Sequence, residues 1–233
     1  GYLEDLENIT TENLYEYYLE FLKKDNVDIF IIGDIDVNEM EEIIGRNFSI
    51  NTIKKKNISH IIEHKDFKRT PKDLKESKNV NQSILIVASK LKNITHFERM
   101  YVLAVYNYIL GGGPDSRLFK EVKEKNSLCY YISSSHSGIA NLELINSGID
   151  GKNYDKALKL IKKQMKEMSL GNFTEEEVEI AKINSKAALK EIEDTPSGIL
   201  NLYEAHEYLG YDLLEERAEN IDKVTKEDVI NIT

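Results

Sequence analysis

The segment Leu110–Tyr131, with the sequence LGGGPDSRLFKEVKEKNSLCYY, most strongly constrains how this chain can fold. Its glycine triplet and Pro-Asp pair interrupt one helical pattern, a short amphipathic helix follows, and Leu128-Cys129-Tyr130-Tyr131 begins a strand pattern. Lys123 precedes Tyr130 by seven residues. Because a flexible loop, a cation and a phenol lie so close together, we predict a substrate-binding hinge between a helix and a strand.

The rest of the chain alternates between apolar runs and amphipathic patterns. Buried strands are predicted at residues 27–35 and 82–89, and two further strands at 128–136 and 140–149 should form an antiparallel hairpin around Gly138. Helical periodicity is found over residues 10–24, 37–47, 95–110, 153–169, 175–193, 197–209 and 211–222. This order predicts an α+β fold with two layers, in which a mainly antiparallel sheet packs against helices.

The stretch from Ser49 to Asn79 has no sustained period and is rich in lysine, asparagine and serine, with Pro71 near its end. We therefore predict three parts: a helix–strand–helix unit over residues 1–50, a linker over 51–79 and a domain over 80–233. A chain of 233 residues has room for this arrangement.

The two ends of the chain share a short repeat. Residues 6–14 (LENITTENL) and 221–229 (IDKVTKEDV) have the same apolar, acidic and capping pattern. The repeat predicts a duplicated unit of about 215 residues. Residues 1–50 would then be the tail of a preceding homologous unit, and we expect a fragment truncated at both ends. The strand at 27–35 could fill the sheet position of its missing counterpart.

Charge and cysteine content exclude several classes of protein. A net charge of −10 argues against binding to nucleic acid or to anionic membranes. The sequence has no run of about 18 apolar residues and no signal sequence. The single cysteine, Cys129, excludes an intrachain disulfide and a thiolate-only zinc site, and it fits a reducing compartment. We expect a cytoplasmic protein.

The strand QSILIVAS, the following helix and the pattern S-R-L-F-x-x-V-x-E-x-x-x-L-x-Y over residues 116–130 are followed by a hairpin and acidic helices. Across residues 80–233 this order resembles the second half of insulinase/pitrilysin-type zinc peptidases and their mitochondrial processing-peptidase relatives. Residues 1–50, with GDID near Gly33, resemble the end of the first half more weakly.

The resemblance implies a division of labour between two halves. The first half of such peptidases holds zinc on H-x-x-E-H and a distant glutamate, and the metal-free second half closes over it. We therefore expect no catalytic residue and no cofactor here, and zinc in a homologous partner half, either upstream in the same chain or in a separate subunit. The substrate would be a peptide, and a dimer is left open.

The resemblance also implies a site. An arginine and a tyrosine seven residues apart grip the substrate backbone near the scissile carbonyl in these peptidases, and Lys123 and Tyr130 occupy the matching positions. Lysine keeps the charge but lacks the planar bidentate fork of arginine. We expect Gly111, Gly112, Gly113 and Ser116 to contact the peptide as well. The alternative is a solvated lysine, a strand tyrosine and a plain turn.

The linker contains the sequence H-x-x-E-H itself, at His60, Glu63 and His64. On a helix this motif binds zinc and supplies a catalytic base. It lies outside the position expected from the resemblance, Pro71 shortens any helix, and the nearest third ligand, Glu143, lies in a predicted strand. We thus predict a substrate-binding, metal-free half. A non-catalytic assembly scaffold is the second hypothesis, and an active zinc peptidase using residues 60–64 is the third.

Overall fold

The computed structural model describes residues 2–24, 27–48, 61–62 and 71–232. The chain divides into two compact units, Gly1–Ile58 and Ser59–Thr233. The first unit contains α1 (Leu3–Leu6), α2 (Thr11–Lys24) and α3 (Val37–Asn47). The helices predicted at residues 10–24 and 37–47 are therefore confirmed. Asp36 caps α3 by accepting a hydrogen bond from the Glu39 amide at 2.9 Å.

The prediction of a strand at residues 27–35 is wrong. The segment lies in the first unit and has no strand assignment, and Phe30 is 37% exposed. The described residues of this unit contain helices but no strand. An apolar run becomes a stable strand only when further strands pair with it and cover a face. The sheet of the second unit contains β1, β2 and β3 and no strand from residues 27–35. The prediction that this segment fills the sheet position of a missing counterpart is therefore wrong as well.

The described residues of the second unit form one sheet of three antiparallel strands, β1 (Ser83–Lys90), β2 (Cys129–Ser137) and β3 (Leu142–Ile149), in the order β1-β3-β2. The predicted hairpin is formed by β2 and β3. Ile149 pairs with Ser83 on one side and with Cys129 on the other, and a bulge lies between Cys129 and Tyr131.

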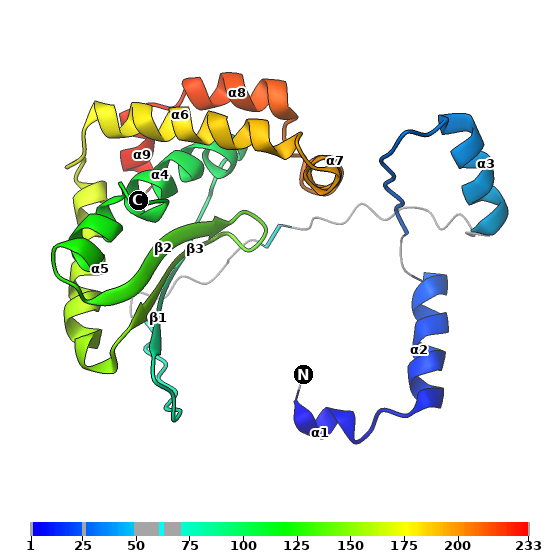
Figure 1. The fold of residues 1–233 in the computed structure, drawn as a ribbon, viewed down its shortest axis with the longest axis horizontal. Coiled ribbons are helices and arrows are strands. Elements are labelled where there is room, and N and C mark those ends of the chain that lie inside the picture. The colour runs from blue at the N-terminus through cyan, green and yellow to red at the C-terminus, as the bar shows by residue number, and fades with distance from the viewer. Residues whose placement is uncertain (1, 25–26, 49–60, 63–70, 233) are drawn as a thin grey trace. The chain divides into compact units, whose positions relative to one another are not determined.

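Helices cover one face of this sheet (Figure 1). Leu85, Ile132 and Ile145 point into the shared core, whereas Ile84 and Ile86 on the opposite face are exposed. The helical elements are η1 (Glu98–Val102), α4 (Leu103–Gly111), η2 (Phe119–Glu124), η3 (Gly151–Asn153), α5 (Tyr154–Ser169), α6 (Glu175–Ile192), α7 (Pro196–Leu209), α8 (Leu214–Asp222) and α9 (Lys226–Asn231). The predicted two-layer α+β fold is confirmed.

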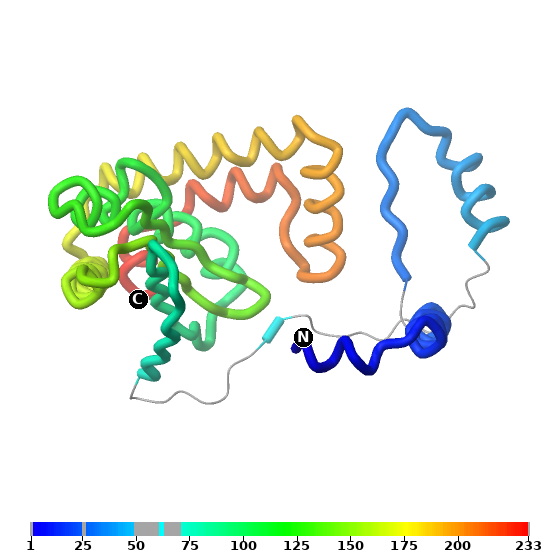
Figure 2. Tube along the Cα trace, turned by 60° about the horizontal axis from the view of Figure 1, so that its bottom comes forward, coloured from blue at the N-terminus to red at the C-terminus, as the bar shows by residue number. Residues whose placement is uncertain are grey.

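Helix ends follow the chemistry of the sequence. Thr174 and Glu177 form a capping box at the start of α6, and Thr195 caps α7 directly before Pro196. Helix α7 turns the chain, so that α6 and α8 lie side by side (Figure 2). In the part of the chain that the structure describes, no helix combines the length and apolar character needed to cross a membrane.

The repeat at the chain ends has matching local structure. Thr10 accepts a hydrogen bond from the Asn13 amide at 3.2 Å, and Thr225 accepts one from the Asp228 amide at 3.1 Å. The Asn13 and Asp228 side chains accept in return from the Thr10 and Thr225 amides, at 2.9 and 2.8 Å. The two copies of the repeat differ in burial. The apolar residues of the second copy, Ile221, Val224 and Val229, are in the core of the second unit. Their equivalents in the first copy, Leu6, Ile9 and Leu14, are exposed.

Candidate functional site

The glycine loop begins where α4 meets β2. A Cβ atom on Gly111 would lie 2.5 Å from the backbone nitrogen of Ser134, and one on Gly112 would lie 2.7 Å from Cα of Tyr108. Both glycines are therefore required by close backbone packing. Gly113 has no such constraint, since a Cβ atom added to it would meet no described atom within 4 Å. The loop that was predicted to contact peptide thus also fixes the end of α4 on the sheet.

Ser116 and Arg117 anchor the chain that leaves this loop. Ser116 is buried, and its hydroxyl donates a hydrogen bond to the Gly113 carbonyl at 2.6 Å. Arg117 donates from Nε to Gln164 of α5 at 3.3 Å and from Nη1 to Glu177 of α6 at 3.1 Å. These contacts hold the start of η2 against two helices. Contact of Ser116 with peptide stays a prediction.

Lys123 lies on η2 with its ammonium nitrogen 4.7 Å from the centre of the Phe119 ring. At this distance the ring face attracts the cation. The backbone carbonyl of Lys123 accepts a hydrogen bond from Ser127 at 2.9 Å, and the chain then turns directly into β2. Lys123 is therefore held near the junction between η2 and the first residues of β2.

Tyr130 lies in the bulge between Cys129 and Tyr131 and is 59% exposed. The bulge breaks the alternation of side chains along β2, which directs this phenol out of the core. The pKa of Cys129 is raised by burial, and a hydrogen bond with Ser147 and the positive charge of Lys123 partly offset that shift. Lys123 thus acts electrostatically on the residue next to Tyr130. The structure brings both predicted residues to one junction, although no hydrogen bond joins their described side chains.

A second polar cluster lies on the helix-covered face of the sheet. His136 and Glu143 are cross-strand neighbours, and the Asn107 Nδ2 atom lies 3.2 Å from His136 Nδ1 and 3.0 Å from Glu143 Oε2. Burial raises the pKa of Glu143 to about 8 and lowers the pKa of His136. This cluster was not among the predicted sites. The sequence does contain a signal for it. Side chains alternate along a strand, so Glu143 lies on the same face of β3 as the apolar Ile145 and is expected to be buried.

The H-x-x-E-H sequence is only partly described. His60, Glu63 and His64 lie outside the described residues. The two residues between them, Ile61 and Ile62, are not helical, and Ile62 donates a backbone hydrogen bond to the Ile139 carbonyl at 2.7 Å. Zinc binding by this motif needs one continuous helical turn. Among the described residues, no group of three histidine, cysteine, aspartate or glutamate side chains could hold a metal ion.

Comparison with known proteins identifies this architecture. The family model described as "Peptidase M16 inactive domain" matches residues 8–185. The chain belongs to this family. The resemblance to insulinase/pitrilysin-type peptidases is confirmed.

Individual relatives agree with this assignment to the peptidase M16 inactive domain family. The chain is 32% identical over 232 residues to the "Probable inactive metalloprotease YmfF" of Bacillus subtilis (strain 168), covering 99% of this chain and 54% of that protein. It is 27% identical over 194 residues to the "Uncharacterized zinc protease YmxG" of the same organism, covering 81% of this chain and 45% of that protein. The chain thus spans about half the length of these relatives.

Solved structures share the fold of this M16 inactive domain. A conserved protein from Enterococcus faecalis V583 matches with a TM-score of 0.89 and 27% identity, covering 100% of this chain and 55% of that one. A protease from Helicobacter pylori matches with a TM-score of 0.78 and 17% identity, covering 100% of this chain and 57% of that one.

Proposed function

We propose that this chain is the metal-free, substrate-binding half of an M16-type zinc metallopeptidase and is not catalytic by itself. Its membership of a family described as inactive carries this proposal. The proposed peptide-binding wall is the junction of η2 and β2, with Lys123 and Tyr130 as the principal side chains. The glycine loop at residues 111–113 and Ser116 border the same segment.

The chemistry of this wall is electrostatic. A lysine ammonium and a tyrosine hydroxyl both donate hydrogen bonds, and a peptide carbonyl accepts them. When a carbonyl is attacked, negative charge develops on its oxygen, and positioned donors lower the free energy of that state. Exposure of Tyr130 and the position of Lys123 beside the start of β2 support this role. The zinc ion and its catalytic base would come from the partner half.

The proposed partner is a homologous, zinc-bearing unit, either upstream in the same polypeptide or in a separate subunit. The matching hydrogen bonds around Thr10 and Thr225 support a duplication. Leu6 is 61% exposed, whereas its counterpart Ile221 is 3% exposed and packs in the core of the second unit. We infer that residues 1–50 pack against another α/β unit of the same kind. We also propose that the protein acts in the cytoplasm.

Two measurements test this function. The purified chain should not hydrolyse a mixture of unstructured peptides, with or without added zinc, and chelator-sensitive hydrolysis would contradict the proposal. In the complete enzyme, Lys123→Ala should remove about 1–3 kcal/mol of transition-state stabilisation and lower kcat/KM accordingly. Lys125→Ala is the matched control, because Lys125 is two residues from Lys123 and its side chain, which pairs with Glu121, is 65% exposed.

One relative favours a second candidate, in which the complete protein is a non-catalytic assembly scaffold. The Bacillus subtilis protein that is 32% identical has "inactive metalloprotease" in its name. Metal analysis of the complete protein separates the two candidates. One bound zinc per homologous pair of halves supports the peptidase, whereas a metal-free complete protein that forms stable assemblies supports the scaffold.

A further inference from the structure

The turn between β2 and β3 holds one residue of the predicted linker. The Ile62 amide donates a hydrogen bond to the Ile139 carbonyl at 2.7 Å, and the Ile62 carbonyl accepts one from Nδ2 of Asn141 at 2.9 Å. Both backbone polar groups of Ile62 are therefore bound by the same turn. Ile62 is 53% exposed, so the turn recognises the backbone of this residue rather than its side chain.

Asn141 is oriented for this contact by the second unit. It is 1% exposed, and its Oδ1 atom accepts a hydrogen bond from Nε of Arg99 in η1 at 3.3 Å. Because a guanidinium group is only a donor, this bond directs Oδ1 toward Arg99 and leaves Nδ2 for the linker. Arg99 is itself 7% exposed and donates from Nη2 to the Ile94 carbonyl at 3.3 Å. The donor that binds Ile62 is thus held by a buried network.

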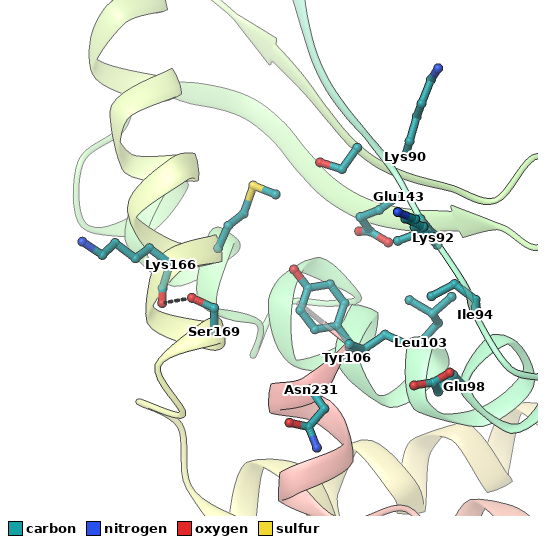
Figure 3. Close-up of a pocket in the computed structure, with 14 residues that line it drawn as sticks. Lys90, Lys92, Ile94, Glu98, Leu103, Tyr106, Glu143, Lys166, Ser169 and Asn231 are labelled. Atoms are coloured by element: carbon teal, nitrogen blue, oxygen red, sulfur yellow. Dashed lines mark hydrogen bonds between the residues drawn. The ribbon is translucent and has the colours of Figure 1, made fainter. Parts of the chain in front are cut away.

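The chain that follows β1 completes the site. Lys92 and Ile94 of this segment are among the residues that line a cavity of about 540 Å³ (Figure 3). The Leu91 amide of the same segment donates a hydrogen bond to the Asn141 carbonyl at 2.8 Å. Asn141 therefore connects the linker with two other segments, η1 and the chain after β1.

The backbone of Asn141 indicates that its side chain has a function. Its φ is +48°, in the left-handed region. Glycine adopts this region at no steric cost, and asparagine is one of the few other residues that tolerate it. Glycine would therefore suffice for the turn, but it has no side chain with which to hold the linker. The contact with Ile62 explains why asparagine occupies this costly conformation.

We propose that the β2–β3 turn is a docking site for a backbone segment, that the linker at Ile62 is its occupant, and that this contact is a strap that shortens the connection between the two units. Phe48 is the last described residue of the first unit, 14 residues from Ile62 but 35 residues from Ser83, where β1 begins. Since a chain spans at most roughly 3.5 Å per residue, the strap lowers the greatest length of the connection from about 120 Å to about 50 Å. The proposal is independent of the function proposed for Lys123 and Tyr130.

A second contact of the linker is weaker. The Tyr154 hydroxyl at the start of α5 lies 3.4 Å from Oδ1 of Asp73, which is longer than usual for a hydrogen bond between oxygen atoms. The ammonium nitrogen of Lys75 is 5.4 Å from the centre of the Tyr154 ring. Both residues follow Ile62 in the chain, so this contact does not shorten the connection while Ile62 is bound. Tyr154→Phe is therefore a suitable control.

The first test is amide hydrogen exchange at Ile62, measured by nuclear magnetic resonance on the full chain. We expect this amide to exchange at least about tenfold more slowly than in a free peptide with the sequence of residues 58–66. Exchange in the full chain as fast as in the peptide would overturn the proposal.

Variants of Asn141 assign this protection to the clamp. Asn141→Gly keeps the left-handed turn and removes the side chain, whereas Asn141→Asp keeps an acceptor for Arg99 and removes the donor. Each should accelerate exchange at Ile62 about tenfold. Asn146→Asp, at an exposed position of β3, and Tyr154→Phe should behave like the parent. Unchanged exchange in both Asn141 variants, when folded, would overturn the role of this residue.

Variants of the linker keep the proposal testable if the Asn141 variants do not fold. Ile62→Pro removes the amide that donates to Ile139, whereas Ile62→Ala keeps both backbone groups and is the matched control. In small-angle X-ray scattering of the full chain, Ile62→Pro should increase the radius of gyration, and Ile62→Ala and Tyr154→Phe should not. The same radius of gyration in Ile62→Pro and Ile62→Ala would overturn the claim that the strap shortens the connection.

Discussion

Replacing Glu143 by glutamine should make the folded chain more stable at neutral pH. The carboxyl is buried on the inner face of β3, and its pKa rises from 4.5 to about 8 because burial disfavours the charged form. The hydrogen bond from Asn107 offsets only part of this shift. Glutamine preserves the shape and an acceptor oxygen but does not titrate.

The size of the effect follows from linkage between folding and protonation. Below pH 4.5 the carboxyl is protonated in both states, so it does not make stability depend on pH. As the pH rises from 4.5 to 8, the unfolded chain releases this proton and the folded chain retains it, so stability is lost across that window. The pKa of 4.5 in the unfolded chain lies about 2.5 units below pH 7. Keeping the proton in the folded chain at pH 7 therefore costs about 3 kcal/mol of stability.

Urea unfolding followed by far-ultraviolet circular dichroism measures this difference. In phosphate or acetate buffer, Glu143→Gln should gain about 3 kcal/mol over the parent chain at pH 7 and much less at pH 5. Glu176→Gln, the charge-matched control at an exposed position at the start of α6, should follow the parent at both pH values. If the parent and Glu143→Gln had the same dependence of stability on pH, the argument that burial keeps Glu143 protonated would be refuted.

Two further predictions concern the scaffold around the loop and the chain ends. Gly111→Ala should lower the free energy of unfolding by about 1–3 kcal/mol, because its Cβ would meet the Ser134 backbone at 2.5 Å, whereas Gly113→Ala should be close to neutral in the same urea titration. Thr225→Ala removes the cap of α9 and should cost about 1 kcal/mol, whereas Thr225→Ser should retain most of that stability; equal losses in the two variants would show that the hydroxyl cap does not contribute.

Sequence patterns predicted most of the second unit because its elements satisfy their own local chemistry. The capping box at Thr174 and the Thr195-Pro196 pair determine where α6 and α7 begin, and the structure agrees. The β2–β3 hairpin follows from two apolar runs around a glycine. These signals depend on neighbouring residues in the chain, so they remain valid without knowledge of tertiary contacts.

The features that the sequence did not predict depend on contacts between residues far apart in the chain. Residues 27–35 have the composition of a buried strand, but a strand also needs a paired neighbour, which the described part of the first unit does not contain. The glycine loop was predicted to contact substrate, with a plain turn as the alternative, and its role in packing was missed because the approach of Ser134 to Gly111 cannot be seen in the sequence. The buried pair of Glu143 and Asn107 was likewise missed, because its hydrogen bond joins residues that are 36 positions apart in the chain.

The most direct test of the central claim is peptide hydrolysis by this chain alone and together with its zinc-bearing partner half. We expect no hydrolysis by the chain alone and chelator-sensitive hydrolysis by the pair. Within the pair, Lys123→Ala should lower kcat/KM about 5- to 150-fold, and Lys125→Ala should not. Hydrolysis by the isolated chain, or full activity of the Lys123→Ala pair, would contradict the claim that this unit is a metal-free wall that grips the substrate.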